Sequence, residues 1–198
     1  MPVSLILAST SPYRAALLER LGLTFKVEAS GIAERPLADE APAARALRLA
    51  IAKALAVAAA HPDDWVLGSD QVADCDGRIL EKPGDAERCR RQLAVCSGRS
   101  VRFYTAAVLA HGERGAVSQH VDCTTVRFRP LSGDEIARYV ERDRPFDCAG
   151  GFRCEGLGIA LFDGVDCSDP TALIGLPLIW VASALRQAGL DPLAANQS

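Results

Sequence analysis

The first side chain that could do chemistry is Arg14, because it occupies an unfavourable place for a cation. It precedes Leu17 and Leu18 by three and four residues, so it falls on the apolar stripe of a predicted helix. It also lies in the first turn of that helix, where the helix dipole is positive. A bound anion would resolve both conflicts, and Ser9 and Ser11 offer hydroxyls to the same anion. The alternatives are that Arg14 bends out to solvent or pairs with a carboxylate.

Two lysines are informative because the chain has only three, against 19 arginines. Lys53 is the one charge in the stretch LAIAKALAVAAA, residues 49–60. Such a lysine must snorkel to solvent, pair with an acid or meet an anion, and snorkelling is the commonest outcome. Lys82 precedes Pro83 in a predicted loop. Together with Arg14, these lysines form a set of cations that could hold a polyanion.

Two carboxylates complete the candidate set. Asp70 ends the apolar run WVLG, residues 65–68, and α/β sheets place their chemistry at the ends of buried strands. An aspartate that merely caps local N–H groups is the alternative. Glu34 lies in a predicted loop before Pro36. The two acids could serve as a base or as metal ligands, and the three cations could hold phosphate oxygens. Phosphate-ester chemistry with a divalent cation requires these groups.

These residues must be positioned by alternating strands and helices. Hydrophobic periodicity, caps and turn residues predict strands at 4–9, 25–29, 65–70, 100–110, 116–129 and 159–162, and a hairpin over 71–80 that turns at Asp76-Gly77. Helices are predicted at 12–21, 43–60, 85–96, 132–143 and 171–188, the last interrupted or offset at Pro177. This pattern is typical of an α/β fold with a mixed sheet. Strict alternation would put Asp70 and Gln71 on opposite faces of their strand, unless that strand breaks near Gly68 or the cleft wraps its end.

Composition narrows the class of protein. The 198 residues carry 22 Lys+Arg against 25 Asp+Glu, for a net charge of −3, which suits one domain over 1–198 and argues against nucleic acid as a partner. No apolar run approaches the ~20 residues of a membrane span, and the N-terminus MPVSLILASTSP lacks the basic region of a secretory signal. Seven irregularly spaced cysteines without C-x-x-C favour free thiols in the cytoplasm.

Five short motifs resemble those of the Maf family of nucleoside triphosphate pyrophosphatases, also called the septum-formation-inhibitor family. They are LASTSPYR (residues 7–14), GSDQ (68–71), KP (82–83), CAG (148–150) and GLP (175–177). The resemblance runs in order from about Ser4 to Leu193, nearly the whole chain. It implies an elongated mixed sheet with flanking helices and a central cleft, similar to inosine triphosphate pyrophosphatases. It also implies hydrolysis of a nucleoside triphosphate to a monophosphate and pyrophosphate with a divalent metal cation, Mg or Mn.

The family pattern assigns roles to nine positions of this chain. Asp70 falls on the proposed general base and, with Glu34, on the acids that would hold the metal. The polar and basic positions of the cleft, which would bind the substrate, are Ser9, Arg14, Lys53 and Lys82. The positions that separate substrate classes are Tyr13, Gln71 and Glu155.

An aromatic residue at position 13, together with Gln71 and Glu155, resembles the branch of the family that acts on 7-methyl-GTP. Relatives that act on dTTP and UTP look as though they have a second arginine where Tyr13 stands, so a dTTP/UTP pyrophosphatase is one alternative. A non-catalytic, nucleotide-binding regulator of cell division is the other. Asp70 discriminates against that regulator, because a sensor has no use for a base beside the α-phosphate. Family analogy also suggests a possible homodimer.

Overall fold

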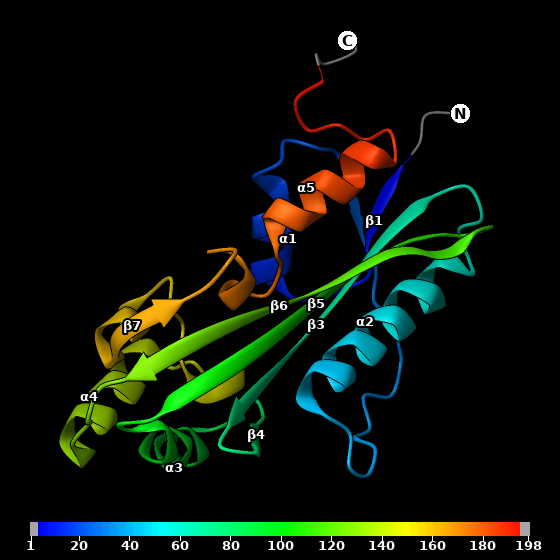
Figure 1. Ribbon diagram of the computed structural model, residues 1–198. Coiled ribbons are helices and arrows are strands. Elements are labelled where there is room, and N and C mark those ends of the chain that lie inside the picture. Colours follow the sequence, from blue (N-terminus) through cyan, green and yellow to red (C-terminus); the bar gives the residue numbers. More distant parts are fainter. Residues whose placement is uncertain (1–3, 195–198) are drawn as a thin grey trace.

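A computed structural model describes residues 4–194, and Figure 1 shows an elongated, twisted sheet with helices on both of its faces. The sheet has seven strands in the order β2-β1-β3-β5-β6-β7, with β4 paired to β3 off this path. Their bounds are β1 Leu5–Leu7, β2 Lys26–Val27, β3 Trp65–Cys75, β4 Arg78–Leu80, β5 Ser100–His111, β6 Gly115–Phe128 and β7 Phe162–Asp166. β1 pairs in parallel with β2 and β3, and the other pairs are antiparallel. The expected mixed α/β fold is therefore confirmed.

Five α-helices and three 3-10 helices flank this sheet within the described residues. They are α1 Pro12–Glu19, α2 Pro42–Ala58, α3 Ala86–Cys96, α4 Gly133–Asp143, α5 Leu178–Gln187, η1 Ala149–Gly151, η2 Leu157–Leu161 and η3 Ala172–Ile174. Ser11 caps α1, because its Oγ accepts from the Arg14 N–H at 3.4 Å. The predicted capping box of Ser132 and Glu135 opens α4. No helix among residues 4–194 is long and apolar enough to cross a membrane.

Strand alternation distributes the core over both faces of the sheet. Leu5 and Leu7 of β1 pack with α1 and α5, whereas Ile6 and Ala8 pack with the alanine-rich face of α2. Figure 1 shows α2 on one side of β3 and the pair α1 and α5 on the other. A further cluster joins α3 and α4 to the far halves of β3, β5 and β6. The middle of β3 therefore lies between helices from several parts of the chain.

Two parts of the predicted pattern differ from the structure, and a third agrees with it. β3 runs unbroken to Cys75, so the strand predicted at 65–70 and the first arm of the hairpin are one strand, although the predicted turn at Asp76-Gly77 is confirmed. The strand predicted at 159–162 is wrong, because η2 occupies that stretch and β7 begins at Phe162. A short apolar run does not distinguish these two states by periodicity. The interruption predicted at Pro177 in the helix over 171–188 is confirmed, because η3 ends at Ile174 and α5 begins at Leu178, with Pro177 at its N-cap position.

Gly68 lets α2 approach β3 at backbone distance. A Cβ atom at this position would lie 2.5 Å from the Ala50 carbonyl oxygen and 2.8 Å from the Ala54 Cβ. Those α2 atoms are completely buried and have no room to move away. The absence of a side chain at Gly68 therefore sets the spacing between the helix that carries Lys53 and the strand that carries Asp70.

Gly68→Ala is expected to lower the free energy of unfolding by about 1–3 kcal/mol, because the added methyl group forces α2 away from the sheet. Urea denaturation of the purified protein measures this difference. Gly133→Ala is the matched control, since a Cβ there meets nothing within 4 Å. Equal stability of the Gly68→Ala variant and the wild-type protein would contradict the close helix–strand contact.

Candidate active site

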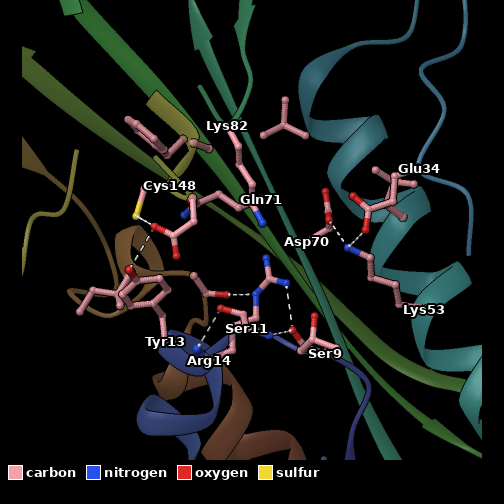
Figure 2. Close-up of a pocket in the computed structure, with 18 of the residues that line it drawn as sticks. Ser9, Ser11, Tyr13, Arg14, Glu34, Lys53, Asp70, Gln71, Lys82 and Cys148 are labelled. Atoms are coloured by element: carbon pink, nitrogen blue, oxygen red, sulfur yellow. Dashed lines mark hydrogen bonds and ion pairs between the residues drawn. The ribbon is translucent and has the colours of Figure 1, made fainter. Parts of the chain in front are cut away.

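A cavity of about 630 Å³ opens beside the middle of β3, within the size range of small-molecule sites. Its walls come from the β1–α1 loop, the loop before α2, α2 itself, β3, the β4 end, residues 147–155 and residues 173–175. All nine candidate residues line this one cavity: Ser9, Tyr13, Arg14, Glu34, Lys53, Asp70, Gln71, Lys82 and Glu155. The structure thus brings together residues that lie up to 146 positions apart in the sequence (9 to 155). Figure 2 labels all of these residues except Glu155 and shows how they lie.

Lys53 is buried between two carboxylates. Its Nζ atom lies 2.6 Å from Asp70 Oδ1 and 2.7 Å from Glu34 Oε1, as the dashed lines in Figure 2 show. Lys53 and Asp70 are only 7% and 6% exposed. Of the outcomes considered for Lys53, the structure therefore shows pairing with acids and not snorkelling. A buried ion pair of this kind holds both side chains in fixed positions.

The surroundings of Asp70 shift its pKa in opposing directions. Burial raises the pKa of Asp70 above the ordinary aspartate value, and Lys53 and Arg14 counteract only part of that effect. The neighbouring Glu34 is more exposed. Its partial burial is outweighed by Lys53, Lys82 and Arg14, which hold the pKa of Glu34 below its usual value. Asp70 is therefore the better proton acceptor of the two carboxylates.

Arg14 is fixed by a carbonyl from the other end of the chain. Its Nε–H donates to the Gly175 carbonyl oxygen at 3.0 Å, and its Nη1 donates to Ser9 Oγ at 3.4 Å. Ser69 Oγ donates to the same Gly175 carbonyl at 3.0 Å. Arg14 therefore neither turns to bulk solvent nor forms a salt bridge with a carboxylate of the described chain. Sequence reasoning missed Ser69, although it lies inside the GSDQ motif.

Gln71 and Asp70 both line the cavity although β3 does not break between them. The Gln71 amide nitrogen donates towards Thr105 Oγ1 at 2.9 Å and towards the carbonyls of Ala172 and Leu173 at 3.1 and 3.0 Å. Its amide group therefore holds η3 in place. Because η3 is held by Gln71, the residues that follow it, up to Gly175, lie close to Arg14.

Another wall of the cavity carries Tyr13 and a group of acceptors. The Tyr13 hydroxyl donates to Asp147 Oδ1 at 3.4 Å, and burial raises the pKa of Tyr13 to about 12, so its ring is neutral at ordinary pH. Glu155 is exposed and accepts a hydrogen bond from Cys154 Sγ at 3.4 Å. Asp147 is a cavity carboxylate that the sequence pattern did not single out. Lys82 points into the cavity from the loop after β4 (Figure 2).

The cavity offers few ligands of its own for a metal ion. Within residues 4–194, no group of three or more His, Cys, Asp or Glu side chains is arranged to hold one. Glu34 and Asp70 nevertheless meet at Lys53 Nζ, so their carboxylates are close neighbours. Mg²⁺ is usually held by one or two carboxylates together with substrate phosphates and waters. The pair therefore fits a divalent cation that binds together with a phosphorylated substrate.

All seven cysteines are free, as expected, and none forms a disulfide.

Known proteins resemble this chain over nearly its whole length. Residues 4–188 match the family described as Maf-like protein. A relative from Xanthomonas axonopodis pv. citri (strain 306), named 7-methyl-GTP pyrophosphatase, is 54% identical over 187 residues, which are 94% of this chain and 97% of the relative. A relative of the same name from Cupriavidus pinatubonensis is 50% identical over 192 residues, 96% of each chain.

Among solved structures, a nucleoside-triphosphatase or dITP/XTP pyrophosphatase from Mycobacterium abscessus is similar at 17% identity and a TM-score of 0.45, covering 95% of this chain and 96% of that one. The family match spans the cavity residues from Ser9 to Gly175. On the strength of the family match and of relatives half identical in sequence, this chain belongs to the Maf family.

Proposed function

We propose that this protein hydrolyses 7-methyl-GTP to 7-methyl-GMP and pyrophosphate, and so removes a modified nucleotide. The observation that carries this proposal is the buried Asp70 carboxylate, paired with Lys53 in a cavity that Arg14 and Lys82 also line. The choice of nucleotide is supported by relatives named 7-methyl-GTP pyrophosphatase, which cover 94–96% of this chain at 50–54% identity. Its seven free cysteines favour the cytoplasm as its compartment.

Asp70 is the group that accepts a proton in this reaction. A water molecule attacks the α-phosphorus, its proton passes to the Asp70 carboxylate, and a new bond forms between phosphorus and the water oxygen. The bond from the α-phosphorus to the bridging oxygen then breaks, and pyrophosphate leaves. Lys53 holds the carboxylate in position, and burial raises the pKa of Asp70, which makes it a stronger base.

The cations of the cavity hold the triphosphate. Arg14 can grip two phosphate oxygens at once, because its guanidinium group is planar and Gly175 fixes its orientation. Lys82 adds an exposed positive charge from the loop after β4, and Ser9 contributes a buried hydroxyl. Glu34 and Asp70 would hold a divalent cation, Mg or Mn, whose charge offsets that of the phosphate oxygens and the leaving group.

The wall around Tyr13 suits a methylated guanine. Methylation at the 7-position makes the purine cationic, and the face of a neutral tyrosine ring attracts a cation by about 0.5–2 kcal/mol. Glu155 can accept from the two adjacent donors on the Watson–Crick edge of guanine. A non-catalytic regulator would need neither the buried base nor its lysine partner, so the geometry favours an enzyme.

Asp70→Asn is expected to slow turnover by ~10²-fold or more, because the amide is not a base. Folding should change little, because asparagine has the same shape as aspartate and its Oδ1 can still accept a hydrogen bond from Lys53. Lys53 also keeps its ion pair with Glu34. Release of pyrophosphate from 7-methyl-GTP is the measurement, and circular dichroism checks the fold. Near-normal pyrophosphate release by the folded variant would remove Asp70 from the mechanism.

The wild-type enzyme is expected to have a higher kcat/KM for 7-methyl-GTP than for GTP, dTTP or UTP. Tyr13→Leu should shrink the preference over GTP by about 0.5–2 kcal/mol, because it keeps bulk and removes the aromatic face. Tyr13→Phe is the matched control and should keep the preference. Glu155→Gln should weaken the binding of GTP and of 7-methyl-GTP alike, by about 1–3 kcal/mol, because the new amide N–H donor would face the N–H donors of guanine. A wild-type preference for dTTP or UTP would refute the proposed substrate.

A further inference from the structure

A second cation lies on the cavity face of α2, in line with Lys53. Arg45, Leu49 and Lys53 are spaced by four residues, so they follow one another along one side of the helix, and all three line the cavity. Lys53 has a role through Asp70, whereas the mechanism so far makes no use of Arg45. Arg45 comes eight residues before Lys53, which is about 12 Å along the helix axis. It therefore extends the positive wall beyond the reacting centre.

Arg45 is held by few contacts for a side chain that is mostly buried. Its side chain is 12% exposed, and its Nη2 donates to Glu81 Oε1 at 3.0 Å. Glu81 is itself 67% exposed, so this is a pair with a solvent-exposed acid, and such a pair contributes little to stability. The Nε–H of Arg45 is buried and has no acceptor among residues 4–194. A buried donor without a partner is uncommon and points to a ligand that would reorient the guanidinium group.

Arg48, on the same helix, shows what a satisfied arginine looks like here. Its Nε and Nη2 donate to the two carboxylate oxygens of Glu40 at 2.5 and 2.7 Å, and Nη2 also donates to the Arg35 carbonyl at 3.2 Å. Arg48 does not line the cavity. The contrast between the two arginines indicates that Arg45 is oriented for something other than the stability of the helix.

We propose that Arg45 binds the β- and γ-phosphates of the substrate, the part that leaves as pyrophosphate, and that Glu81 is its counter-ion until the substrate arrives. This inference rests on the proposed function. The purine wall, with Tyr13 and Glu155, belongs to α1 and to residues 147–155, whereas Arg45 belongs to α2. Lys82, the neighbour of Glu81 in sequence, lines the same cavity and adds its charge there.

The chemistry of the guanidinium group also favours the phosphate end over the base. Arg45 carries only donors, and methylation at the 7-position blocks the N7 acceptor that a guanidinium group normally contacts together with O6 of guanine, so the usual bidentate contact with the base is lost. Phosphate oxygens accept two parallel hydrogen bonds from a guanidinium group. Exchange of the Glu81 carboxylate for a phosphate group keeps the charge of Arg45 neutralised and provides further acceptors for its donors.

Isothermal titration calorimetry with inorganic pyrophosphate, in the presence of Mg²⁺, tests this directly. Arg45→Gln is expected to weaken pyrophosphate binding by about tenfold or more, the size of a lost charge-assisted contact, and to leave 7-methyl-GMP binding unchanged. Arg48→Gln is the matched control and should leave both affinities unchanged. Glu81→Gln should tighten pyrophosphate binding, because it removes the competing carboxylate.

The opposite signs separate a binding role from a structural one. If Arg45 only stabilises the fold through Glu81, then Arg45→Gln and Glu81→Gln would shift pyrophosphate affinity in the same direction or not at all, and the inference would be wrong. Equal weakening of pyrophosphate and 7-methyl-GMP would also contradict it. Failure of the proposed function looks different: wild-type protein would bind pyrophosphate through Arg45 but release none from any nucleoside triphosphate.

Discussion

The ion pair between Lys53 and Asp70 is the interaction on which the rest of the site depends. Both side chains are almost fully buried, and the Asp70 carboxylate would be strongly disfavoured there without Lys53, whereas Lys53 also has Glu34 as a partner. Their contact requires α2 to lie directly on β3, which Gly68 and the small residues Ala50 and Ala54 permit. The close packing of α2 on β3 and the pairing of the two charges therefore depend on each other, because α2 cannot move outward without separating Lys53 from Asp70.

The remaining parts of the cavity are arranged around this pair by contacts between distant segments. Gly175 lies 161 residues after Arg14, yet its carbonyl orients the arginine, and Ser69, next to Asp70, donates to the same oxygen. Gln71 holds η3, the helix that leads to this carbonyl. Cations therefore surround the buried Asp70 carboxylate. The segment from η3 to Gly175, which lines the cavity, is hydrogen-bonded to β3, the strand that contains Asp70.

Much of this site could be predicted from the sequence, because its residues conflict with their local patterns. Lys53 is conspicuous in an alanine-rich helix, and Arg14 lies on an apolar stripe at the wrong end of a dipole. Pattern alone could not decide whether Lys53 snorkels or pairs, since Asp70 is 17 residues away and their contact depends on tertiary packing. Pattern also left open whether the strand breaks near Gly68 or the cleft wraps its end; β3 is unbroken, and one cavity reaches both Asp70 and Gln71.

Other residues gave no signal in the sequence. Arg45 lies in a stretch with a second arginine, Arg48, so nothing local distinguishes the cavity residue from the one that pairs with Glu40. The 3-10 helix η2 escaped prediction because a short apolar run is also compatible with a strand. These misses share one cause: each depends on which neighbours tertiary packing supplies, and periodicity carries no information about that.

A double-mutant cycle between Lys53 and Asp70 tests the central claim, that their buried pairing organises the site. Lys53→Met, Asp70→Asn and the double variant would be compared by urea denaturation at neutral pH. The account predicts that Lys53→Met destabilises the wild-type protein by about 1–3 kcal/mol more than it destabilises the Asp70→Asn variant, because only the former leaves a buried carboxylate without its partner. Equal effects of Lys53→Met in the two backgrounds would show that the pair carries no coupling, and would contradict the account.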